Sequence, residues 1–373
     1  MGRPRKTEAE VADIAGQIEK GIKEIEDNRS LEFFSTGSDI FDLICGKGVC
    51  FGKMINIIGG SSSGKSFICS EIIARARKIY GNKIKWNYKD CEAGYSFDSQ
   101  ALWGLDIVDE NSAEVDTVED FAIDIRNELG KLKSDEKLVY VLDSYDALSS
   151  FEASKNYNKK LTAIEKGNKV DGDYGMTKAK FINEFFRETI REIKEKNCLW
   201  IILSQTRDNI GAGTFAPAKK RNGGDSLKFY SAIVLWLRVA EKYGKQGRQT
   251  GISVHIKNDK NKLANPFREG YIDIIFDYGI DNIGSNIKFL YDLYTPEGYV
   301  KDSVEGKAKK KKDGTEETKV AMLDWDGQEY TYKELIKYVE ANNLERVLTG
   351  RVKQKWAELE RNLDFEGRKK RYE

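Results

Sequence analysis

The chain has 373 residues, of which 40% are hydrophobic and 33% are charged, a balance typical of a soluble globular protein. Its 62 lysines and arginines offset 61 aspartates and glutamates, so the net charge alone indicates neither a nucleic-acid nor a membrane partner. No apolar run approaches the roughly 20 residues needed to cross a bilayer, and no signal peptide is recognisable, so we expect a cytoplasmic protein. One histidine and five cysteines without a CxxC pair argue against a zinc ribbon or a histidine-based metal site.

The segment 7–27 carries apolar side chains at a spacing of three to four residues. They are Val11, Ile14, Ile18, Ile22 and Ile25. This spacing predicts an amphipathic helix whose narrow apolar stripe must dock on another surface. We therefore expect residues 1–34 to form an N-terminal arm that docks on another surface.

From residue 54 onward strands alternate with helices, which predicts an α/β fold with a mainly parallel central sheet covered on both faces. The expected strands are 54–59, 83–88, 137–143, 198–204, 232–239, 252–257 and 271–276, with helices ending at Gly81, over 118–133 and over about 176–196. After about residue 285 a lysine-rich linker (301–319) precedes a short hairpin and helical segments. We expect an α/β core domain over 35–285 and a small α+β C-terminal domain over 286–373.

The first of these strands is followed by GGSSSGKS, which fits the pattern G-x-x-x-x-G-K-[ST]. In such a loop backbone N–H groups wrap around a phosphate, the lysine reaches the β- and γ-phosphates, and the serine hydroxyl ligates Mg²⁺. A serine- and glycine-rich turn is the alternative, which the position between a strand and a helix disfavours. We predict that ATP and Mg²⁺ are bound here by Gly59, Gly60, Ser61, Ser62, Ser63, Gly64, Lys65, Ser66 and Phe67.

Two carboxylates follow later strands. Asp143 comes after five apolar residues, so we expect it at the carboxyl edge of a central strand, where it would complete the magnesium site with Ser66. Glu92 lies just beyond the strand 83–88 and is a candidate general base for activating water. Each has a plain alternative, because aspartates in turns and glutamates at strand ends are common.

Several motifs occur in one order: STGSDIFDLICGKGVCFGKMINIIGGSSSGKS, CEAG, VLDSYDAL, SQTR, NGGDSLKFY and KNKLANPF. This order resembles the RecA family of homologous-recombination ATPases, including the phage recombinases of the UvsX type. The similarity extends from about Ser35 to Asp281, and GQIEK at 16–20 resembles the family's N-terminal helix. The resemblance implies a RecA-like P-loop ATPase that forms a helical homo-oligomer on single-stranded DNA, with ATP between neighbouring subunits. It also implies homologous double-stranded DNA, single-stranded-DNA-binding proteins and loader proteins as partners, in a bacterial or phage-infected cell.

The resemblance also implies roles for single residues. Glu92 matches the glutamate that activates the attacking water, and Gln205 matches the glutamine that senses the γ-phosphate. Lys260 and Lys262 match paired lysines that reach the neighbour's ATP, where composition alone would permit a solvated basic turn. Phe276 stands where an aromatic residue packs near the adenine. With Lys65, these residues form the predicted catalytic set.

The segment after SQTR, Asp208 to Ala232, contains glycines, a proline and three consecutive cations. Single-stranded DNA is held by cations on phosphates and by apolar groups against bases, and glycines let the backbone approach a phosphate closely. The predicted DNA-binding residues are Arg207, Ile210, Phe215, Lys219, Lys220, Arg221, Gly223, Gly224, Lys180 and Arg187. For Lys180 and Arg187, two turns apart on one helix, a charged helix surface is an equally good interpretation.

The chain departs from the family pattern in places. Ser96 and Ser99 replace an aspartate and a tyrosine near the base, and the first DNA loop, 154–175, is longer. Asp225 replaces an asparagine and would repel DNA unless it caps the following element.

The leading hypothesis is a DNA-dependent ATPase that forms filaments and performs homologous pairing and strand exchange. A recombination mediator that binds ATP without exchanging strands is one alternative, which the full set of catalytic matches disfavours. A ring-forming helicase with the same core is another, which the KNKLANPF motif and the N-terminal helix disfavour.

Overall fold

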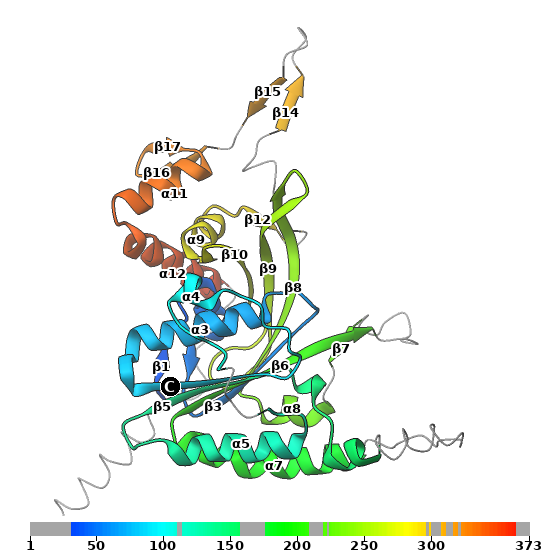
Figure 1. Ribbon diagram of the computed structural model, residues 1–373. Helices are drawn as coiled ribbons and strands as arrows, with labels where there is room; N and C mark the ends of the chain where they lie inside the picture. The colour runs from blue at the N-terminus through cyan, green and yellow to red at the C-terminus, as the bar shows by residue number, and fades with distance from the viewer. Residues whose placement is uncertain are drawn as a thin grey trace, which may run out of the picture.

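The computed structural model describes residues 31–109, 114–156, 176–208, 219–221, 224–295, 298–299, 307–310, 316–319 and 322–362. Its centre is a nine-stranded sheet with the strand order β11-β10-β9-β8-β3-β6-β5-β4, in which β7 also pairs with β6 (Figure 1). Five neighbouring strands are parallel: β8 (Ile233–Lys245), β3 (Lys53–Gly59), β6 (Cys198–Asp208), β5 (Lys137–Asp143) and β4 (Ile84–Asp90). The antiparallel strands are β9 (Arg248–Asn261), β10 (Glu269–Ile275), β11 (Gly279–Asp281) and β7 (Lys219–Arg221). The α/β class and the parallel centre are confirmed, while the strands predicted at 252–257 and 271–276 extend the sheet in antiparallel order.

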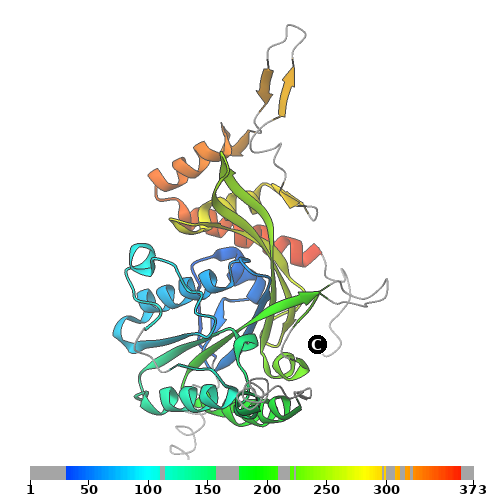
Figure 2. The same cartoon turned by 45° about the vertical axis from the view of Figure 1, so that its right-hand side comes forward.

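Helices cover both faces of the sheet (Figures 1 and 2). One face carries α2 (Asp39–Cys45), α3 (Lys65–Tyr80), α4 (Ser99–Trp103) and α9 (Asn282–Leu290). The other carries α5 (Val118–Lys131), α7 (Met176–Glu195) and α8 (Gly224–Tyr230). The start of α5 shows why these residues form a helix, because Thr117 and Asp120 each accept the backbone N–H of the other in a capping box. The end of α3 at Gly81 and the positions of α5 and α7 agree with the predicted helices to within two residues.

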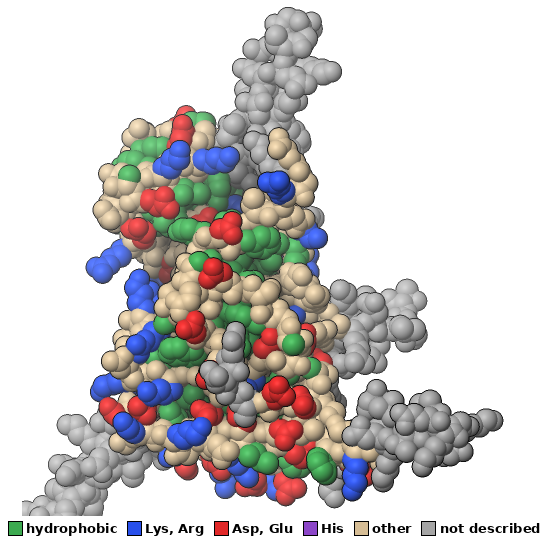
Figure 3. Space-filling model, in the orientation of Figure 1, with side chains coloured by type: hydrophobic (Ala, Val, Ile, Leu, Met, Phe, Trp, Pro, Cys, Tyr) green, Lys and Arg blue, Asp and Glu red, His purple; other side chains and the backbone are tan. Residues whose placement is uncertain are grey.

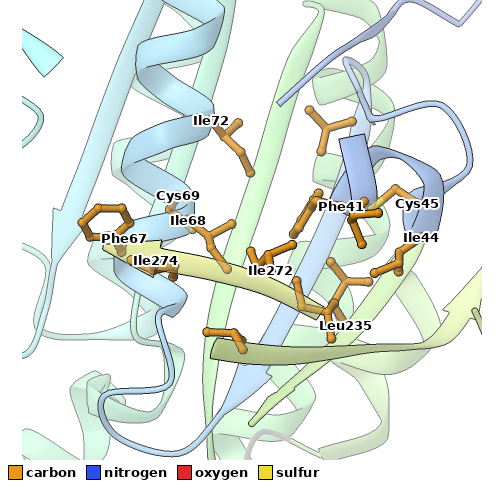
Figure 4. Close-up of a cluster of buried hydrophobic side chains, with 14 of the residues drawn as sticks. Phe41, Ile44, Cys45, Phe67, Ile68, Cys69, Ile72, Leu235, Ile272 and Ile274 are labelled. Carbon is orange, nitrogen blue, oxygen red and sulfur yellow. The ribbon is translucent and has the colours of Figure 1, made fainter. Parts of the chain in front are cut away.

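The central strands alternate between two hydrophobic clusters, one on each face of the sheet. On β3, Ile55 and Ile57 belong to the cluster under α2 and α3, whereas Met54 belongs to the cluster under α5 and α7. Side chains of a strand alternate in this way because the strand period is two residues. Figure 4 shows part of the first cluster, where Ile72 of α3 and Phe41 of α2 lie near the strands. Both faces of the sheet are therefore buried, which explains why the central strands are nearly continuous apolar runs in the sequence.

The second cluster is built around one tryptophan. Trp200 of β6 is fully buried, and its ring lies 5.6 Å from Phe121, 5.7 Å from Phe185 and 5.5 Å from Phe186. Burying each such side chain contributes roughly 1.5–3 kcal/mol. These contacts fix α5 and α7 against the strands that carry the site described below.

The C-terminal elements pack against the core. The predicted hairpin is confirmed as β16 (Leu323–Trp325) and β17 (Gln328–Tyr330), followed by α11 (Tyr332–Ala341) and α12 (Glu345–Asn362). Leu335, Val339 and Leu348 belong to the same buried cluster as the residues of α2 and α3. The domain boundary expected at 285/286 therefore falls inside α9. Helices before and after α9 in the chain contribute to one apolar cluster.

Three further pairs of short strands lie outside the central sheet. They are β1 (Phe33–Phe34) with β2 (Val49–Cys50), β12 (Tyr294–Thr295) with β13 (Gly298–Tyr299), and β14 (Lys307–Lys310) with β15 (Glu316–Lys319). The last pair lies within the lysine-rich segment predicted as a linker. Across the described ranges, every helix is too short or too polar for a membrane crossing.

Candidate active site

Four parallel strands end at one edge of the sheet, and most of the residues predicted to bind nucleotide and magnesium or to catalyse hydrolysis lie at or just beyond their ends. Gly59 closes β3, Asp143 closes β5, and Gln205 is the β6 residue paired with Gly59. Glu92 follows the end of β4. Carboxyl ends of parallel strands, at the point where loops cross to helices, are where α/β proteins bind ligands. We call this region the carboxyl edge.

The loop between β3 and α3 has the backbone that its sequence predicts. Ser62 and Gly64 have positive φ angles of 57° and 87°. A Cβ atom at Gly64 would lie 2.8 Å from Ile274 Cδ1, so only glycine suits this position. Ser63 Oγ is buried and has no hydrogen-bond partner within the described residues. A buried hydroxyl left in this state costs free energy, which a ligand in the loop can recover.

Lys65 closes the loop. Its Nζ donates to the carbonyl oxygens of Gly59 at 3.0 Å and Gly60 at 2.8 Å. Burial lowers the pKa of Lys65, and the charges of Asp143 and Glu92 partly oppose that shift. An ammonium has three donors, and the described residues accept two of them, so one remains for an anionic ligand.

The two predicted magnesium ligands meet directly. Ser66 Oγ donates to Asp143 Oδ2 at 2.5 Å, and Tyr88 OH donates to the same oxygen at 2.5 Å. Burial raises the pKa of Asp143, while the hydrogen bonds from Ser66 and Tyr88 oppose the rise. A hydroxyl and a carboxylate are the oxygen donors that Mg²⁺ prefers, so the pair fits that ion. The described residues hold no cluster of three or more acidic, histidine or cysteine ligands, so phosphate oxygens and water would complete the coordination.

Glu92 joins two other strands of the carboxyl edge. Its Oε1 accepts a hydrogen bond from Gln205 Nε2 at 2.8 Å and another from Ser144 Oγ. Both bonds fall on the same carboxylate oxygen, so Oε2 remains to accept from water. The predicted base and the predicted γ-phosphate sensor are therefore in contact before any ligand is considered.

Three residues of the carboxyl edge were missed in the sequence. Tyr88 ends the strand KIKWNY, Ser144 directly follows Asp143, and Asp146 lies in the same VLDSYDAL motif. Asp146 Oδ2 accepts the backbone N–H of Gln205 at 2.5 Å. The only sequence signal for Ser144 and Asp146 is their proximity to Asp143, which ends an apolar run, and Tyr88 is marked only by its place in a predicted strand.

Lys260 and Lys262 lie away from the carboxyl edge. Lys260 pairs with Val234 of β8, which is level with Asn56 on β3, three residues before Gly59. At 3.3 Å per residue that is about 10 Å back along the strands, and β9 lies two strands from β3. The chain therefore does not bring these lysines to its own phosphate loop.

The ammonium groups of both lysines instead contact carbonyl oxygens in the last turn of α8. Lys260 Nζ donates to the carbonyl oxygens of Lys228 and Phe229, and Lys262 Nζ donates to Phe229 at 3.2 Å. Cations suit this position because carbonyl groups are unpaired at a helix C-terminus. Phe229, whose ring centroid lies 5.7 Å from Lys262 Nζ, is 68% exposed, and Phe267 is 69% exposed. Exposed aromatic rings such as these are enriched at protein interfaces.

The predicted aromatic contacts of the nucleotide differ in exposure. Phe276, directly after β10, is 38% exposed, so its ring is accessible to a ligand. Phe67 is buried at the start of α3, where its ring lies 5.2 Å from Trp103 and 5.4 Å from Phe97. Phe67 therefore fixes α4 against α3, and only its backbone is placed to serve the loop.

The predicted DNA-binding residues that the structure describes lie on four elements, β6, β7, α8 and α7. Arg207 pairs with Lys220 across the β6–β7 hairpin, whose other pairs are Thr206 with Arg221 and Asp208 with Lys219. Gly224 begins α8 and Asp225 is its second residue, a position where acidic residues are favoured.

Lys180 and Arg187 lie on α7, and Arg187 Nε is 3.1 Å from Glu188 Oε1. Ile210, Phe215 and Gly223 lie outside the described residues, as do residues 157–175 of the first DNA loop and residues 1–30 of the N-terminal arm. Acidic and basic side chains are intermixed over the face shown in Figure 3.

Comparison with known proteins agrees with this arrangement. A family model described as the RecA N-terminal domain matches residues 8–281. Protein RecA of Allochromatium vinosum is 30% identical over 306 residues, which cover 81% of this chain and 82% of that protein. Protein RecA of Crocosphaera subtropica is 31% identical over 260 residues, or 68% of each chain. Protein RecA of Arthrospira platensis is 30% identical over 295 residues, covering 77% of this chain and 74% of that protein. The range of the family model contains the carboxyl edge, Lys260 and Lys262.

Proposed function

Because the chain belongs to the RecA family, we propose that it is an ATP- and single-stranded-DNA-dependent recombinase that forms helical filaments and catalyses homologous pairing and strand exchange. In this proposal it acts on homologous duplex DNA in the cytoplasm of a bacterial or phage-infected cell, with single-stranded-DNA-binding and loader proteins as partners. Residues 1–34 would serve as the oligomerisation arm, and residues 286–373 would contact duplex DNA.

One observation carries the proposal: two complementary sets of residues lie apart on the same sheet. Lys65 and Glu92 lie at the carboxyl edge, whereas Lys260 lies back along the strands, on β9. The ammonium groups of Lys260 and Lys262 contact the last turn of α8. A second copy stacked head to tail can present its lysines to the first copy's phosphate loop. Repetition of such a contact gives a filament when the rotation does not close.

The chemistry proposed for the carboxyl edge follows from its contacts. Backbone N–H groups of the loop and the free N–H of Lys65 hold the triphosphate. Bound Mg²⁺ would neutralise phosphate charge, with Ser66 and Asp143 as its protein ligands. Glu92 Oε2 takes the proton of the attacking water, while Gln205 and Ser144 hold Oε1. Lys260 and Lys262 of the neighbouring copy stabilise the charge on the transferring phosphoryl group.

The experiment that tests the proposal measures ATP hydrolysis with and without single-stranded DNA, then D-loop formation with homologous duplex. We expect slow turnover without DNA, strong stimulation by single-stranded DNA, and D-loops that require ATP and homology. Electron micrographs of the same mixture should show helical filaments.

Other outcomes would point to the alternatives. ATP binding without D-loops would favour a recombination mediator, and closed rings would favour a helicase. Absence of DNA stimulation would overturn the proposal.

A further inference from the structure

Asp146 makes a contact that the proposed chemistry has not used. It lies in the short helix η2 (Tyr145–Ala147), three residues after Asp143. Its Oδ2 accepts the backbone N–H of Gln205 at 2.5 Å. A hydrogen bond to a charged acceptor is shorter and stronger than one between neutral groups. Asp146 therefore holds the main chain of the predicted γ-phosphate sensor.

Gln205 lies where β6 leaves the main sheet, so the contact with Asp146 acts at that point. Gln205 is the last residue of β6 that pairs with β3, and its partner there is Gly59. The next residue, Thr206, pairs with Arg221 of β7. The pairing of β6 with β5 has already ended at Ile202. Gln205 is thus the junction between the sheet and the β6–β7 hairpin, and Asp146 replaces the support that β5 no longer provides.

The segment 143–146, from the last residue of β5 into η2, consequently supports three parts of the carboxyl edge at once. Asp143 accepts from Ser66, Ser144 donates to Glu92, and Asp146 accepts from the backbone of Gln205. The Gln205 side chain in turn donates to Glu92. If the main chain at Gln205 is held in place, a movement of the hairpin rotates Gln205 and so changes the hydrogen bond between its side chain and Glu92.

We propose that Asp146 is a positioning residue that holds the main chain of Gln205 in place. When single-stranded DNA displaces the β6–β7 hairpin, the anchored Gln205 turns and its bond to Glu92 changes, which sets the DNA stimulation of ATP hydrolysis. The inference rests on the proposed function, because it concerns how DNA binding is coupled to hydrolysis.

The test compares Asp146→Ala, which removes the acceptor, with Asp146→Asn, whose amide oxygen can still accept an N–H. Glu136→Ala is the matched control, because Glu136 also accepts a backbone N–H, that of Lys133 at 3.1 Å, just before β5 begins. ATP hydrolysis with and without single-stranded DNA and the affinity for a fluorescent ATP analogue are measured for each variant.

In Asp146→Ala we expect the stimulation ratio to fall about 10-fold, equivalent to about 1.4 kcal/mol, with ATP affinity within about 2-fold of wild type. Asp146→Asn should recover part of the ratio, and Glu136→Ala should retain all of it. An unchanged ratio in Asp146→Ala, or an equal loss in Glu136→Ala, would overturn the inference.

A second measurement separates this inference from the proposed function. Amide hydrogen exchange at Gln205 and Thr206, without nucleotide or DNA, should be about 10-fold faster in Asp146→Ala than in wild type or Glu136→Ala. If wild type shows no DNA stimulation, the proposed function fails, and the exchange rates alone decide whether Asp146 anchors the junction. Unchanged exchange refutes the anchor, and faster exchange with full stimulation refutes the coupling.

Discussion

At the scale of single residues, Glu92 is the point where three separate segments meet. Its carboxylate receives donors from Gln205 of β6 and from Ser144 after β5, and it lies beside Lys65, whose ammonium it influences. A carboxylate with one anchored oxygen and one available oxygen is oriented before substrate binds. Such orientation is what a general base requires.

Glu92→Gln should separate binding from hydrolysis. The amide keeps the shape and can still accept a hydrogen bond, but it cannot take a proton from water. We expect DNA-stimulated kcat to fall at least about 100-fold, with ATP affinity and filament formation retained. Steady-state ATPase assays and nucleotide titration measure both properties. Glu128→Gln, on α5 and paired with Lys131, is the control and should be unaffected.

The residues of the site differ in how far their sequence context predicts them. Gly59, Lys65 and Asp143 end apolar runs or match a phosphate-loop pattern, so local sequence places them at the carboxyl edge. Ser144 and Asp146 lack such a pattern. Their roles depend on which side chains of a short turn face β4 and β6, and that is set by tertiary packing.

At the scale of elements, the β6–β7 hairpin carries the cations proposed to hold DNA phosphates. Lys219 and Lys220 of β7 pair with Asp208 and Arg207 of β6, beyond the point where β6 leaves the main sheet. The hairpin thus projects from the carboxyl edge, adjacent to Gln205. Its contribution to DNA binding should be electrostatic and dependent on salt.

Replacement of Lys219 and Lys220 by alanine should weaken binding of single-stranded DNA and reduce its salt dependence. If each lysine neutralises one phosphate, the slope of log K against log salt falls by about 1.4. Fluorescence anisotropy at several salt concentrations measures this slope. The same change at Lys131 and Lys133, around the C-terminal end of α5, should leave it unchanged, and equal slopes for both pairs would contradict the assignment.

A second element-scale prediction concerns His255 of β9, the only histidine in the chain. Burial lowers its pKa below the usual 6.5, Arg238 and Lys257 add to the shift, and Glu269, 3.3 Å from Nε2, opposes it. As pH falls, the unfolded chain therefore takes up this proton before the folded chain does. The stability contributed by neutral His255 is present above pH 6.5 and is lost as pH falls through the lower folded pKa.

Thermal unfolding at about pH 7.5 and about pH 5.5 tests this prediction, because histidine is the side chain that ordinarily titrates in this window. The loss of Tm on acidification should be smaller in His255→Gln than in wild type. Parallel losses in the two proteins would show that other groups are responsible.

The long β8–β9 ribbon shows why sequence patterns predicted only part of the sheet. The expected strands 232–239 and 252–257 are the apolar parts of β8 and β9, which face the buried clusters. Beyond them the ribbon continues through polar residues to a turn at Gln246 and Gly247, both with positive φ. A two-residue turn with this backbone suits a twisted hairpin, but polar strands outside a core carry no alternating pattern.

At the scale of the whole molecule, the separation of the phosphate loop from Lys260 and Lys262 predicts that activity belongs to pairs of subunits. Lys65→Ala removes a loop residue but leaves the lysines, and Lys260→Ala does the reverse. Each variant alone should lack DNA-stimulated hydrolysis. In a mixture, an intact loop can receive lysines from a neighbour.

A 1:1 mixture should therefore recover about one quarter of wild-type activity if subunits assemble at random, because one site in four has both parts intact. ATPase assays of the two variants, separate and mixed, measure this recovery. No recovery on mixing would show that the lysines do not act between subunits. A mixture of Lys65→Ala with Lys65→Ala,Lys260→Ala is the control and should stay inactive.

The packing of α12 has a consequence for how the protein is made. Asp39 of α2 accepts a hydrogen bond from Thr349 of α12, 310 residues later, and also binds Asn282 and Asn286 of α9. During synthesis α2 emerges from the ribosome early, and its contacts can be completed only after nearly the whole chain has been made. Meanwhile apolar residues destined for burial remain exposed, which favours aggregation or capture by chaperones. A premature stop codon before α12 should therefore yield an insoluble fragment, not a smaller ATPase.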